Sequence, residues 1–487
     1  MASLEELRLV RLEKLEKLKK AGLDPYPAAS ARTHTIKEVR GDFDALESSN
    51  ESVIIAGRVM ALRGQGALHF FNIFDGTDSF QGLLKRDEMD AEHFDLFSST
   101  IDIGDFIEIT GTLFTTKRGE PTVAVRGWKI LTKSLLPLPD GWSGFKDTEE
   151  RLRKRYLDIL MNSEVREMVE QKSRFWSAVR SFLVKRDFLE VETPILEVTT
   201  GGADAEPFKT HHNALDMDIY LRISCGELWQ KRLMVSGIPK TFEIGRIFRN
   251  EGMSAEHLQD YTQMEFYWAY ADYEDGMELV TELYRHIAKE AFGTQKFTIG
   301  EFDVDLGVEW KRYDYRDTIE DKTGVDISTA TFEEIEKKLQ DLNIDYARDG
   351  FNKNRAIDTL WKYCRKQITG PGFLIGLPAE LAPLAKRDTT NENITQHFQP
   401  IIAGSELGRG YSELNDPLDQ RARFEEQQAM RDAGDPEAQM ADLEFVEALE
   451  HGMPPTCGYG MSERVFAFLS NKPVRDTQIF PLVKPKE

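Results

Sequence analysis

The bend of a predicted β-hairpin carries the side chains best suited to bind an anion. The run Thr241–Phe248 alternates bulky and small residues, and the run Tyr261–Tyr270 is rich in aromatic, β-prone residues. The bend between these runs contains the charged or titratable side chains Arg249, Glu251, Glu256 and His257. Such a hairpin suits a loop that closes over an anionic ligand, and a surface hairpin with solvated charges is the alternative interpretation.

A second candidate anion site lies near the C-terminus. Gly458 and Gly460 predict a glycine-rich turn that leads into a helix beginning near Ser462, which puts Arg464 on the first helical turn. A basic side chain and a helix N-terminus both favour an anion. The sequence contains no GxxxxGK[ST] motif and no GxGxxG after a leading strand, so neither a P-loop nor a Rossmann site is indicated.

Several glutamates lie on predicted strands or at the start of a predicted helix, where they are candidates for binding a ligand. Glu227 follows a strand and Gly226 and opens a helix, and Glu406 and Glu413 belong to two further predicted strands. For each glutamate alone, a structural ion pair is the alternative. The adjacent pair His211–His212 is interpreted as structural, because neighbouring side chains on a strand point to opposite faces and cannot share a metal ion.

The composition predicts a cytoplasmic globular protein with more than one domain. The 487 residues exceed one ordinary domain, and no apolar run approaches the roughly 20 residues that span a membrane. The charged N-terminus lacks the apolar core of a signal peptide. The three cysteines are far apart and exclude a cysteine-rich zinc site. The net charge of −22 argues against a non-specific nucleic-acid binder, although residues 1–40 are net positive.

Residues 50–135 contain five short predicted strands separated by turn residues. Such strands are typical of a small closed barrel such as the OB-fold, which binds single-stranded nucleic acid on one face. Phe70, Phe71 and Gln81 are candidates for base stacking and a base-edge hydrogen bond, and burial of the aromatic rings in the barrel core is the alternative. Before the barrel, residues 3–21 predict an amphipathic helix, either a docking or coiled-coil helix or a basic arm for nucleic acid.

The second half of the chain begins with a predicted long helix. From Val165 to about Arg186 apolar residues fall on one face, and a predicted strand ending at Pro194 follows. This wide face is either part of a dimer interface or buried within its own domain. The resulting domain prediction is a basic helix and lead-in (1–49), a barrel (50–135), a connector (136–163) and a mixed domain (164–487) with an insertion around 300–370.

In this order, the pieces resemble the class II aminoacyl-tRNA synthetases, and within them the lysyl-tRNA synthetases. The helix and strand ending at Pro194 match motif 1, FRNE at Phe248–Glu251 matches motif 2, and the glycine-rich turn with Arg464 matches motif 3. The stretches GGADAEPFKTHHNALDMDIYLRI, MEFYWAYADY, GYSELNDP and ALEHGMPPT are similar to the lysyl enzymes. The resemblance implies an α+β fold, with an antiparallel catalytic sheet flanked by helices and preceded by an OB-fold barrel that binds the anticodon.

The same resemblance implies ATP-dependent activation of L-lysine, its transfer to tRNA(Lys), a requirement for Mg²⁺, and a homodimer formed through the motif 1 helix. Arg249 and Arg464 are the implied catalytic residues. The implied ATP-binding residues are Arg249, Glu251, His257, Tyr261, Glu406 and Arg464. The implied lysine-binding residues are Glu227, Arg249, Glu265, Tyr267, Arg409, Tyr411 and Glu413. The implied metal ligands are Glu406, Gln399 and Glu413, and the implied anticodon-binding residues are Phe70 and Gln81.

Several positions depart from the family's pattern. Gln399 stands where a metal-binding carboxylate is expected, and Arg409 stands where the family has an asparagine near the substrate carboxylate. The motif 2 loop has Glu256 and Leu258 in place of arginine and asparagine, the motif 3 helix begins MSER instead of GIDR, and Gly127 replaces an anticodon-reading glutamate. These departures bear on the ATP contacts, the number of metal ions and the anticodon rule, and not on the reaction.

Two other functions fit parts of the pattern. A ligase that attaches lysine or a lysine isomer to a protein would resemble the catalytic domain, but it would lack the anticodon-binding domain that this chain has. A catalytically inactive tRNA-binding relative would have lost Arg249, Glu251 or Arg464, and all three are present.

Overall fold

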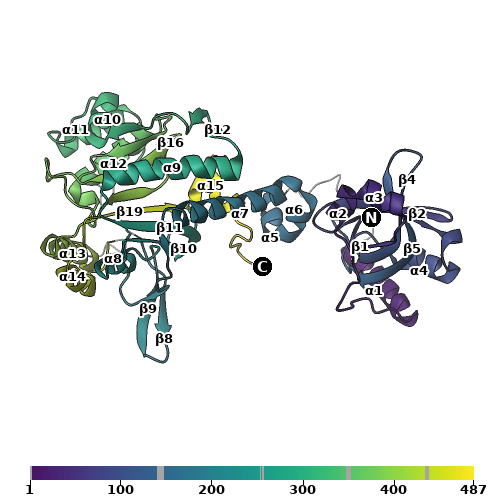
Figure 1. Cartoon of the computed structure of the whole chain (residues 1–487). Helices are drawn as coiled ribbons and strands as arrows, with labels where there is room; N and C mark the ends of the chain where they lie inside the picture. Colours follow the sequence, from purple (N-terminus) through teal and green to yellow (C-terminus); the bar gives the residue numbers. More distant parts are fainter. Residues whose placement is uncertain are drawn as a thin grey trace. The chain divides into compact units, whose positions relative to one another are not determined.

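A computed structural model of the chain describes residues 3–139, 147–203, 205–252, 254, 257–346, 352–433 and 438–486. The chain divides into two compact units, Met1–Arg151 and Leu152–Glu487, and each has an apolar core of its own (Figure 1). Within the described ranges, no helix has both the length and the apolar character needed to cross a membrane.

The first unit is a closed five-stranded barrel in the order β1-β2-β3-β5-β4, with helices packed around it (Figure 1). Its strands are β1 (Val53–Gln65), β2 (Leu68–Phe74), β3 (Ser79–Lys85), β4 (Phe106–Thr115) and β5 (Pro121–Thr132). Its helices are α1 (Leu4–Lys20), α2 (Ile36–Gly41), α3 (Phe43–Ser49) and α4 (Ala91–Thr100). The five predicted strands and the barrel are confirmed, whereas helix α4 was not predicted.

Helix α1 is docked on the barrel unit. Leu15 and Leu18 are buried, and Leu18 belongs to the barrel's core cluster. Arg11 is buried as well, because its guanidinium donates hydrogen bonds to the carbonyl oxygens of Ile103, Ser134 and Leu136 at 2.9–3.2 Å. These contacts favour the docking interpretation of this helix.

Consecutive phenylalanines of β2 point to opposite sides of the barrel wall. Phe71 is 2% exposed and belongs to the core cluster, so burial is correct for Phe71 and stacking on a base is not. Phe70 is half-buried. Because Asn72 lies opposite Gln81 in the ladder and side chains alternate along a strand, Phe70 and Gln81 share the outer face. The Gln81 amide donates to Thr122 Oγ1 at 2.8 Å.

The second unit is built on a nine-stranded sheet in the order β14-β15-β16-β18-β19-β11-β10-β6, with β17 paired to β16. The strands at its centre are β10 (Lys240–Phe248), β11 (Asp260–Ala269), β18 (Arg409–Ser412) and β19 (Thr456–Ser462). The outer strands are β6 (Leu189–Glu190), β14 (Lys311–Asp314), β15 (Gly372–Ile375), β16 (His397–Ile402) and β17 (Ser405–Glu406). The ladders are antiparallel except β6–β10 and β14–β15.

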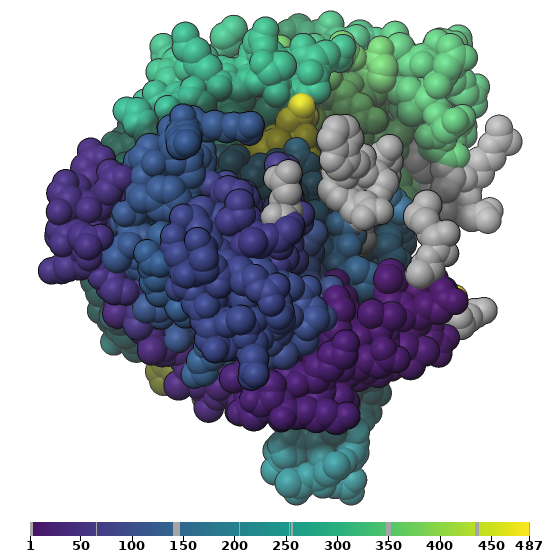
Figure 2. Space-filling model, turned by 90° about the vertical axis from the view of Figure 1, so that its right-hand side faces the viewer, coloured from purple at the N-terminus to yellow at the C-terminus, as the bar shows by residue number. Residues whose placement is uncertain are grey.

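Two small sheets and several helices complete this unit. The small sheets comprise β12 (Lys296–Ile299) with β13 (Phe302–Asp305), and β7 (Leu196–Glu197) with β9 (Met217–Leu221) and β8 (Lys209–His212). The β8–β9 hairpin projects from the unit in both views (Figures 1 and 2). Helix α5 (Thr148–Arg153) contains the division between the two units. The helices of the second unit are α6 (Arg155–Met161), α7 (Ser163–Val184), α8 (Glu227–Val235), α9 (Tyr273–Phe292), α10 (Tyr315–Thr323), α11 (Phe332–Asp341), α12 (Lys353–Arg365), α13 (Pro417–Asp432), α14 (Leu443–Glu450) and α15 (Arg464–Leu469).

Helices α7 and α9 lie side by side (Figure 1). The apolar face predicted for α7 is buried within its own unit, where Phe175, Val179 and Phe182 share a core cluster with Val280 and Leu283 of α9. Burial is therefore the correct alternative for this face. A dimer interface needs other apolar surface.

The strand predicted to end at Pro194 is shorter than expected. Only Leu189–Glu190 forms a ladder with β10, and the chain then leaves this ladder. The backbone N–H and the hydroxyl of Thr193 donate to Glu243 Oε2 at 3.1 and 2.6 Å, so side-chain hydrogen bonds replace ladder bonds at this point. Pro194 itself has no N–H to donate.

The glycine-rich turn predicted at residues 458–460 is instead the middle of a central strand. β19 pairs with β11 on one side and with β18 on the other, and α15 begins only at Arg464. A Cβ atom on Gly458 would lie 2.0 Å from Glu413 Oε1, and one on Gly460 would lie 3.1 Å from Glu265 Cγ. The glycines therefore make room for glutamate side chains. Because α15 has only six residues, anion attraction here rests on the Arg464 guanidinium.

The insertion predicted around residues 300–370 has a core cluster of its own. Helices α10, α11 and α12 contribute Ile319, Leu339 and Leu360 to this cluster, which also includes Leu374 of β15. Strands β14 and β15 extend the edge of the large sheet, so the insertion is attached to the main domain through backbone pairing.

Candidate active site

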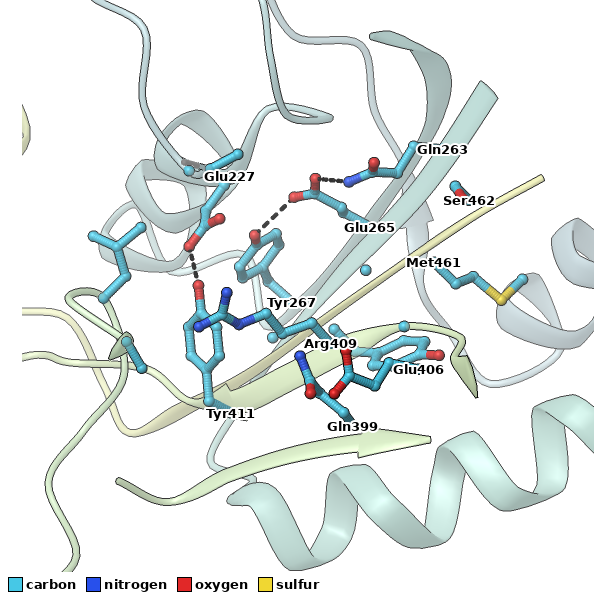
Figure 3. Close-up of a pocket in the computed structure, with 18 of the residues that line it drawn as sticks. Glu227, Gln263, Glu265, Tyr267, Gln399, Glu406, Arg409, Tyr411, Met461 and Ser462 are labelled. Atoms are coloured by element: carbon cyan, nitrogen blue, oxygen red, sulfur yellow. Dashed lines mark hydrogen bonds between the residues drawn. The ribbon is translucent and has the colours of Figure 1, made fainter. Parts of the chain in front are cut away.

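A cavity of about 340 Å³ lies over the central strands of the large sheet (Figure 3). Its lining brings together residues from α8, β11, β18 and β19 that are far apart in the sequence. The predicted site residues that line it are Glu227, Arg249, Tyr261, Glu265, Tyr267, Gln399, Glu406, Arg409, Tyr411, Glu413 and Arg464.

Two predicted ATP-binding residues do not line this cavity. Glu251 is half-buried in the hairpin loop, where its carbonyl oxygen accepts a hydrogen bond from Gln259 Nε2 at 2.9 Å. His257 is exposed, and its Nδ1 lies 2.8 Å from Ser254 Oγ. Glu256 lies outside the described residues. The roles of these loop residues in binding ATP stay predictions.

Glu227 enters the cavity from the first turn of α8. The preceding Gly226 has a φ of +72°, and a Cβ atom there would lie 2.1 Å from Thr193 Oγ1, so only glycine lets the helix start against this segment. Glu227 Oε1 accepts hydrogen bonds from the Tyr411 hydroxyl at 2.5 Å and from Lys231 Nζ at 2.7 Å. The carboxylate is thereby held at a fixed position (Figure 3).

Glu265 lies on β11 and is 3% exposed. It accepts hydrogen bonds from the Cys225 backbone N–H at 2.7 Å, the Tyr267 hydroxyl at 2.9 Å and Gln263 Nε2 at 2.5 Å (Figure 3). Burial, followed by the negative charge of Glu227, raises the pKa of Glu265 to about 7. This carboxyl group can therefore exist in either protonation state near neutral pH.

Glu413 follows β18 and is 1% exposed. Its Oε2 lies 2.5 Å from Lys231 Nζ. Burial raises the pKa of Glu413 well above its usual value, although the Lys231 ammonium acts in the opposite direction. Lys231 was missed in the sequence, and its position four residues after Glu227 at the start of a predicted helix was the available signal.

The other end of the cavity carries arginine and tyrosine side chains. Arg249 directly follows β10, and its Nε donates to the Ile223 carbonyl oxygen at 3.2 Å. Its guanidinium carbon lies 5.9 Å from the centre of the Tyr261 ring, within cation–π range. Burial raises the pKa of Tyr261, and the charge of Arg249 opposes this effect.

Arg464 is positioned by the residue before it. Glu463 is 1% exposed, and its carboxylate forms an ion pair with Lys172 of α7. The same carboxylate accepts the Thr262 backbone N–H at 3.1 Å. These contacts join the start of α15 to α7 and β11, so Arg464 enters the cavity from a fixed backbone.

Glu406 and Gln399 lie side by side on the paired strands β17 and β16 (Figure 3). Trp361 of α12 donates to Glu406 Oε1 at 2.6 Å. Carboxylate and amide oxygens suit a magnesium ion that also binds phosphates, because such an ion needs few protein ligands. The third predicted ligand, Glu413, is held in its ion pair with Lys231. Across the part of the chain that the structure describes, no three acidic, histidine or cysteine side chains converge to form a metal cage.

Arg409 lines the cavity, and its side chain extends toward Tyr411 (Figure 3). Its Nε donates to His397 Nε2 at 3.1 Å, and its Nη2 donates to the Leu381 carbonyl oxygen at 2.8 Å. Burial, together with the charge of Arg409, holds the pKa of His397 well below its usual range, so this imidazole is neutral and accepts the bond. Arg409 therefore adds a fixed positive charge to the cavity wall.

Two models of known protein families match this chain. Residues 147–484 match the model of the tRNA synthetases class II (D, K and N), and residues 53–131 match the OB-fold nucleic acid binding domain. The chain belongs to the class II tRNA synthetases.

Relatives of nearly the same length show which family within this class the chain belongs to. The chain is 42% identical to the lysine–tRNA ligase of Thermotoga maritima, over 99% of this chain and 97% of the relative. It is 43% identical to the lysine–tRNA ligases of Pelotomaculum thermopropionicum and Roseiflexus castenholzii, over 99% of this chain and 96% and 100% of those relatives. Within the class, the chain belongs to the lysine–tRNA ligase family.

Proposed function

We propose that this chain activates L-lysine with ATP and transfers the lysyl group to the 3′ end of tRNA(Lys). The observation that carries this proposal is the gathering of three buried glutamates, Glu227, Glu265 and Glu413, at one end of the cavity. Lysine is the amino acid that brings two ammonium groups and a flexible apolar stem. A site that pairs both ammonium groups rejects a neutral analogue strongly, because its buried carboxylates would then be left unpaired.

In the first step, a carboxylate oxygen of lysine attacks the α-phosphorus of ATP, a P–O bond forms, and pyrophosphate leaves with the electrons of the broken bond. The nucleophile is already ionised, so the step needs no general base. Arg249 lines the cavity and would bind the lysine carboxylate and the α-phosphate together. Arg464 and Tyr261 would hold the nucleotide, with Glu251 and His257 closing over it from the loop. Positioning and charge stabilisation thus account for catalysis.

We also propose Mg²⁺ as the divalent cation that accompanies ATP. Glu406 and Gln399 offer oxygen ligands in the wall of the cavity that Arg249 and Arg464 also line. A bound magnesium ion would neutralise phosphate charge as pyrophosphate leaves. Because Gln399 is neutral, Glu406 would supply the only negative charge of this pair, and Arg409 would supply positive charge nearby.

For the second step, we propose that the barrel unit binds the anticodon of tRNA(Lys). Phe70 and Gln81 lie on one outer face of β2 and β3, where a base can stack on the ring and contact the amide. The 3′ hydroxyl of the tRNA would attack the carbonyl carbon of lysyl-adenylate, and AMP would leave. A cytoplasmic location follows from this role in translation, and the three cysteines are reduced, as expected there.

We propose a homodimer whose interface includes residues 184–198, which begin at the last residue of α7. This stretch exposes several apolar side chains by 46–62%, namely Val184, Leu189, Ile195, Leu196 and Val198. Apolar surface of this kind favours an interface. Leu196→Arg should lower the mass measured by sedimentation, whereas Leu418→Arg, at a residue 74% exposed on α13, should not. An unchanged mass for Leu196→Arg, or a monomeric wild type, would exclude this interface.

The decisive experiment is amino-acid-dependent ATP–pyrophosphate exchange, measured with each of the twenty amino acids. We expect activity with lysine. Activity with aspartate or asparagine, or none with lysine, would overturn the proposed function.

Glu413→Gln should raise the KM for lysine strongly, and an unchanged KM would remove Glu413 from the lysine pocket.

A further inference from the structure

A buried lysine of the protein itself lies behind the proposed lysine pocket. Lys231 is 1% exposed and lies one helical turn after Glu227 on α8. Its Nζ lies 2.7 Å from Glu227 Oε1 and 2.5 Å from Glu413 Oε2. Glu227 and Glu413 come from different elements, so this single ammonium group connects the two.

Aromatic rings surround the same ammonium group. The ring centres of Tyr411, Phe445 and Tyr267 lie 5.5, 5.9 and 6.0 Å from Lys231 Nζ, within the range of cation–π contacts. Burial lowers the pKa of Lys231, but the ion pairs with Glu227 and Glu413 outweigh burial, and the pKa is raised overall. Lys231 is therefore charged in the folded protein.

Lys231 touches the pocket residues from outside the cavity. Glu227, Glu413, Tyr267 and Tyr411 all line the cavity, whereas Lys231 is not among its lining residues. A substrate in the cavity would meet these four side chains and not the Lys231 ammonium. Lys231 therefore acts on a substrate only through the groups that it holds.

The charges of the pocket then match those of lysine. Glu227, Glu265 and Glu413 share one internal ammonium group, which leaves two negative charges among these four side chains when all three carboxyl groups are ionised. The Arg409 guanidinium is directed at His397 and the Leu381 carbonyl oxygen and is not part of this count. Lysine brings two ammonium groups, and its carboxylate is left for Arg249. Without Lys231, a third buried carboxylate would have no countercharge and would take up a proton or move.

We infer that Lys231 is a positioning residue that fixes Glu227 and Glu413 and sets the pocket's charge to complement a substrate with two ammonium groups. This inference rests on the proposed function, because it assigns both glutamates to lysine. The residue acts on binding and leaves the phosphate end of the cavity untouched.

The test compares Lys231→Met with wild type in lysine-dependent ATP–pyrophosphate exchange. We expect the KM for lysine to rise about tenfold or more, because breaking a buried ion pair leaves uncompensated charge. The KM for ATP should change little, and kcat should fall less than KM rises. The melting temperature should fall, because the buried carboxylates lose their countercharge. Lys231→Arg should restore most of the affinity. The control is Lys362→Met, which removes an exposed lysine paired with Asp358 at the same helical spacing.

The pH profile separates positioning from a purely structural role. The groups that face Lys231 are Glu227 and Glu413, with Tyr267, Tyr411 and Phe445 around them and Glu265 beyond Tyr267. The KM for lysine should rise at acid pH, where the pocket's carboxylates take up protons. Removing the ammonium group should move this inflection to higher pH, because the remaining carboxylates hold a proton more tightly. A general loss of packing would instead lower kcat without moving the inflection.

A double-mutant cycle keeps the inference testable if Lys231→Met folds poorly. Lys231→Met combined with Glu413→Gln removes an ammonium group and a carboxylate together, which a core tolerates better than one unpaired charge. We expect the double variant to have a KM well below the product of the two single effects. Multiplicative effects, or a folded Lys231→Met with wild-type KM, would overturn the inference. A wild type inactive with lysine would overturn the proposed function as well.

Discussion

At the level of single residues, the cavity is defined by three glutamates that are almost completely buried. Glu227, Glu265 and Glu413 are 5%, 3% and 1% exposed. Carboxylates are rarely buried to this degree without partners. Each has hydrogen-bond donors or an ammonium group within 3 Å, yet the pKa of Glu265 and of Glu413 is still raised. The pocket thus has more carboxyl groups than its own cations neutralise, which favours a ligand with two ammonium groups.

The raised pKa of Glu265 predicts how lysine binding depends on pH. The pKa of Glu265 is about 7, and an ammonium group binds the ionised carboxylate. Binding is therefore strong above pH 7 and weakens below it, and the KM for lysine should rise by up to about tenfold per pH unit in the acid limb. Pyrophosphate exchange between pH 5.5 and 8.5 measures this. In Glu265→Gln the KM for lysine should no longer rise below pH 7. A wild-type KM for lysine that is constant with pH would contradict the role of Glu265 in binding lysine.

Substitution of Gly458 tests the position of Glu413 in the lysine pocket. Its missing side chain leaves the space that Glu413 Oε1 occupies, so Gly458→Ala must displace this carboxylate. We expect the KM for lysine to rise about tenfold or more, with a smaller change in the KM for ATP. Gly41→Ala is the control, because a Cβ atom on this helical glycine meets open space. Equal lysine KM values for wild type and Gly458→Ala would show that Glu413 does not need this space.

At the level of elements, the insertion contacts a residue of the candidate active site through the side chain of Trp361. Trp361 of α12 belongs to the insertion's own core, and its indole N–H donates to Glu406 Oε1. The helix that positions a proposed metal ligand therefore lies outside the central sheet. A residue that orients a ligand commonly affects metal affinity almost as much as the ligand does.

Trp361→Phe removes this donor and retains an aromatic ring in the core. We expect the magnesium concentration that gives half-maximal exchange to rise about tenfold, with the KM for lysine unchanged. Trp310→Phe is a matched control, since Trp310 is also buried and its indole N–H donates only to the Leu306 carbonyl oxygen. The same magnesium dependence in both variants would exclude a role for Trp361 in positioning Glu406.

The sequence predicts most elements here because their signals are local. Alternation of apolar residues locates the barrel strands and β10–β11, and one apolar face locates α7. Gly458 and Gly460 were misread because glycine in a turn and glycine beside a bulky neighbour look alike in sequence, and the neighbours, Glu413 and Glu265, are distant in the chain. Trp361 was missed for the same reason, because its contact with Glu406 exists only after the insertion packs on β17.

At the level of the whole molecule, the chain separates two tasks between two units. The barrel and the catalytic sheet each have a complete apolar core, so a surface change in one need not disturb the other. In the function that we propose, amino-acid activation takes place in the cavity of the second unit. Transfer to tRNA requires, in addition, the nucleic-acid face that we propose on the first unit.

Paired substitutions of the two adjacent phenylalanines test this division in the intact chain. Phe70→Ala should leave lysine-dependent pyrophosphate exchange unchanged and lower kcat/KM for tRNA about tenfold, since a base–aromatic stack contributes ~1–3 kcal/mol. Gln81→Ala should act in the same direction. Phe71→Ala should instead lower the free energy of unfolding of the barrel by ~3–5 kcal/mol, because it removes a ring that is 2% exposed from the core. Thermal unfolding, exchange and aminoacylation measured on the same samples separate these effects. If Phe70→Ala changed exchange and aminoacylation equally, or neither of them, the barrel's outer face would not be the tRNA-binding surface.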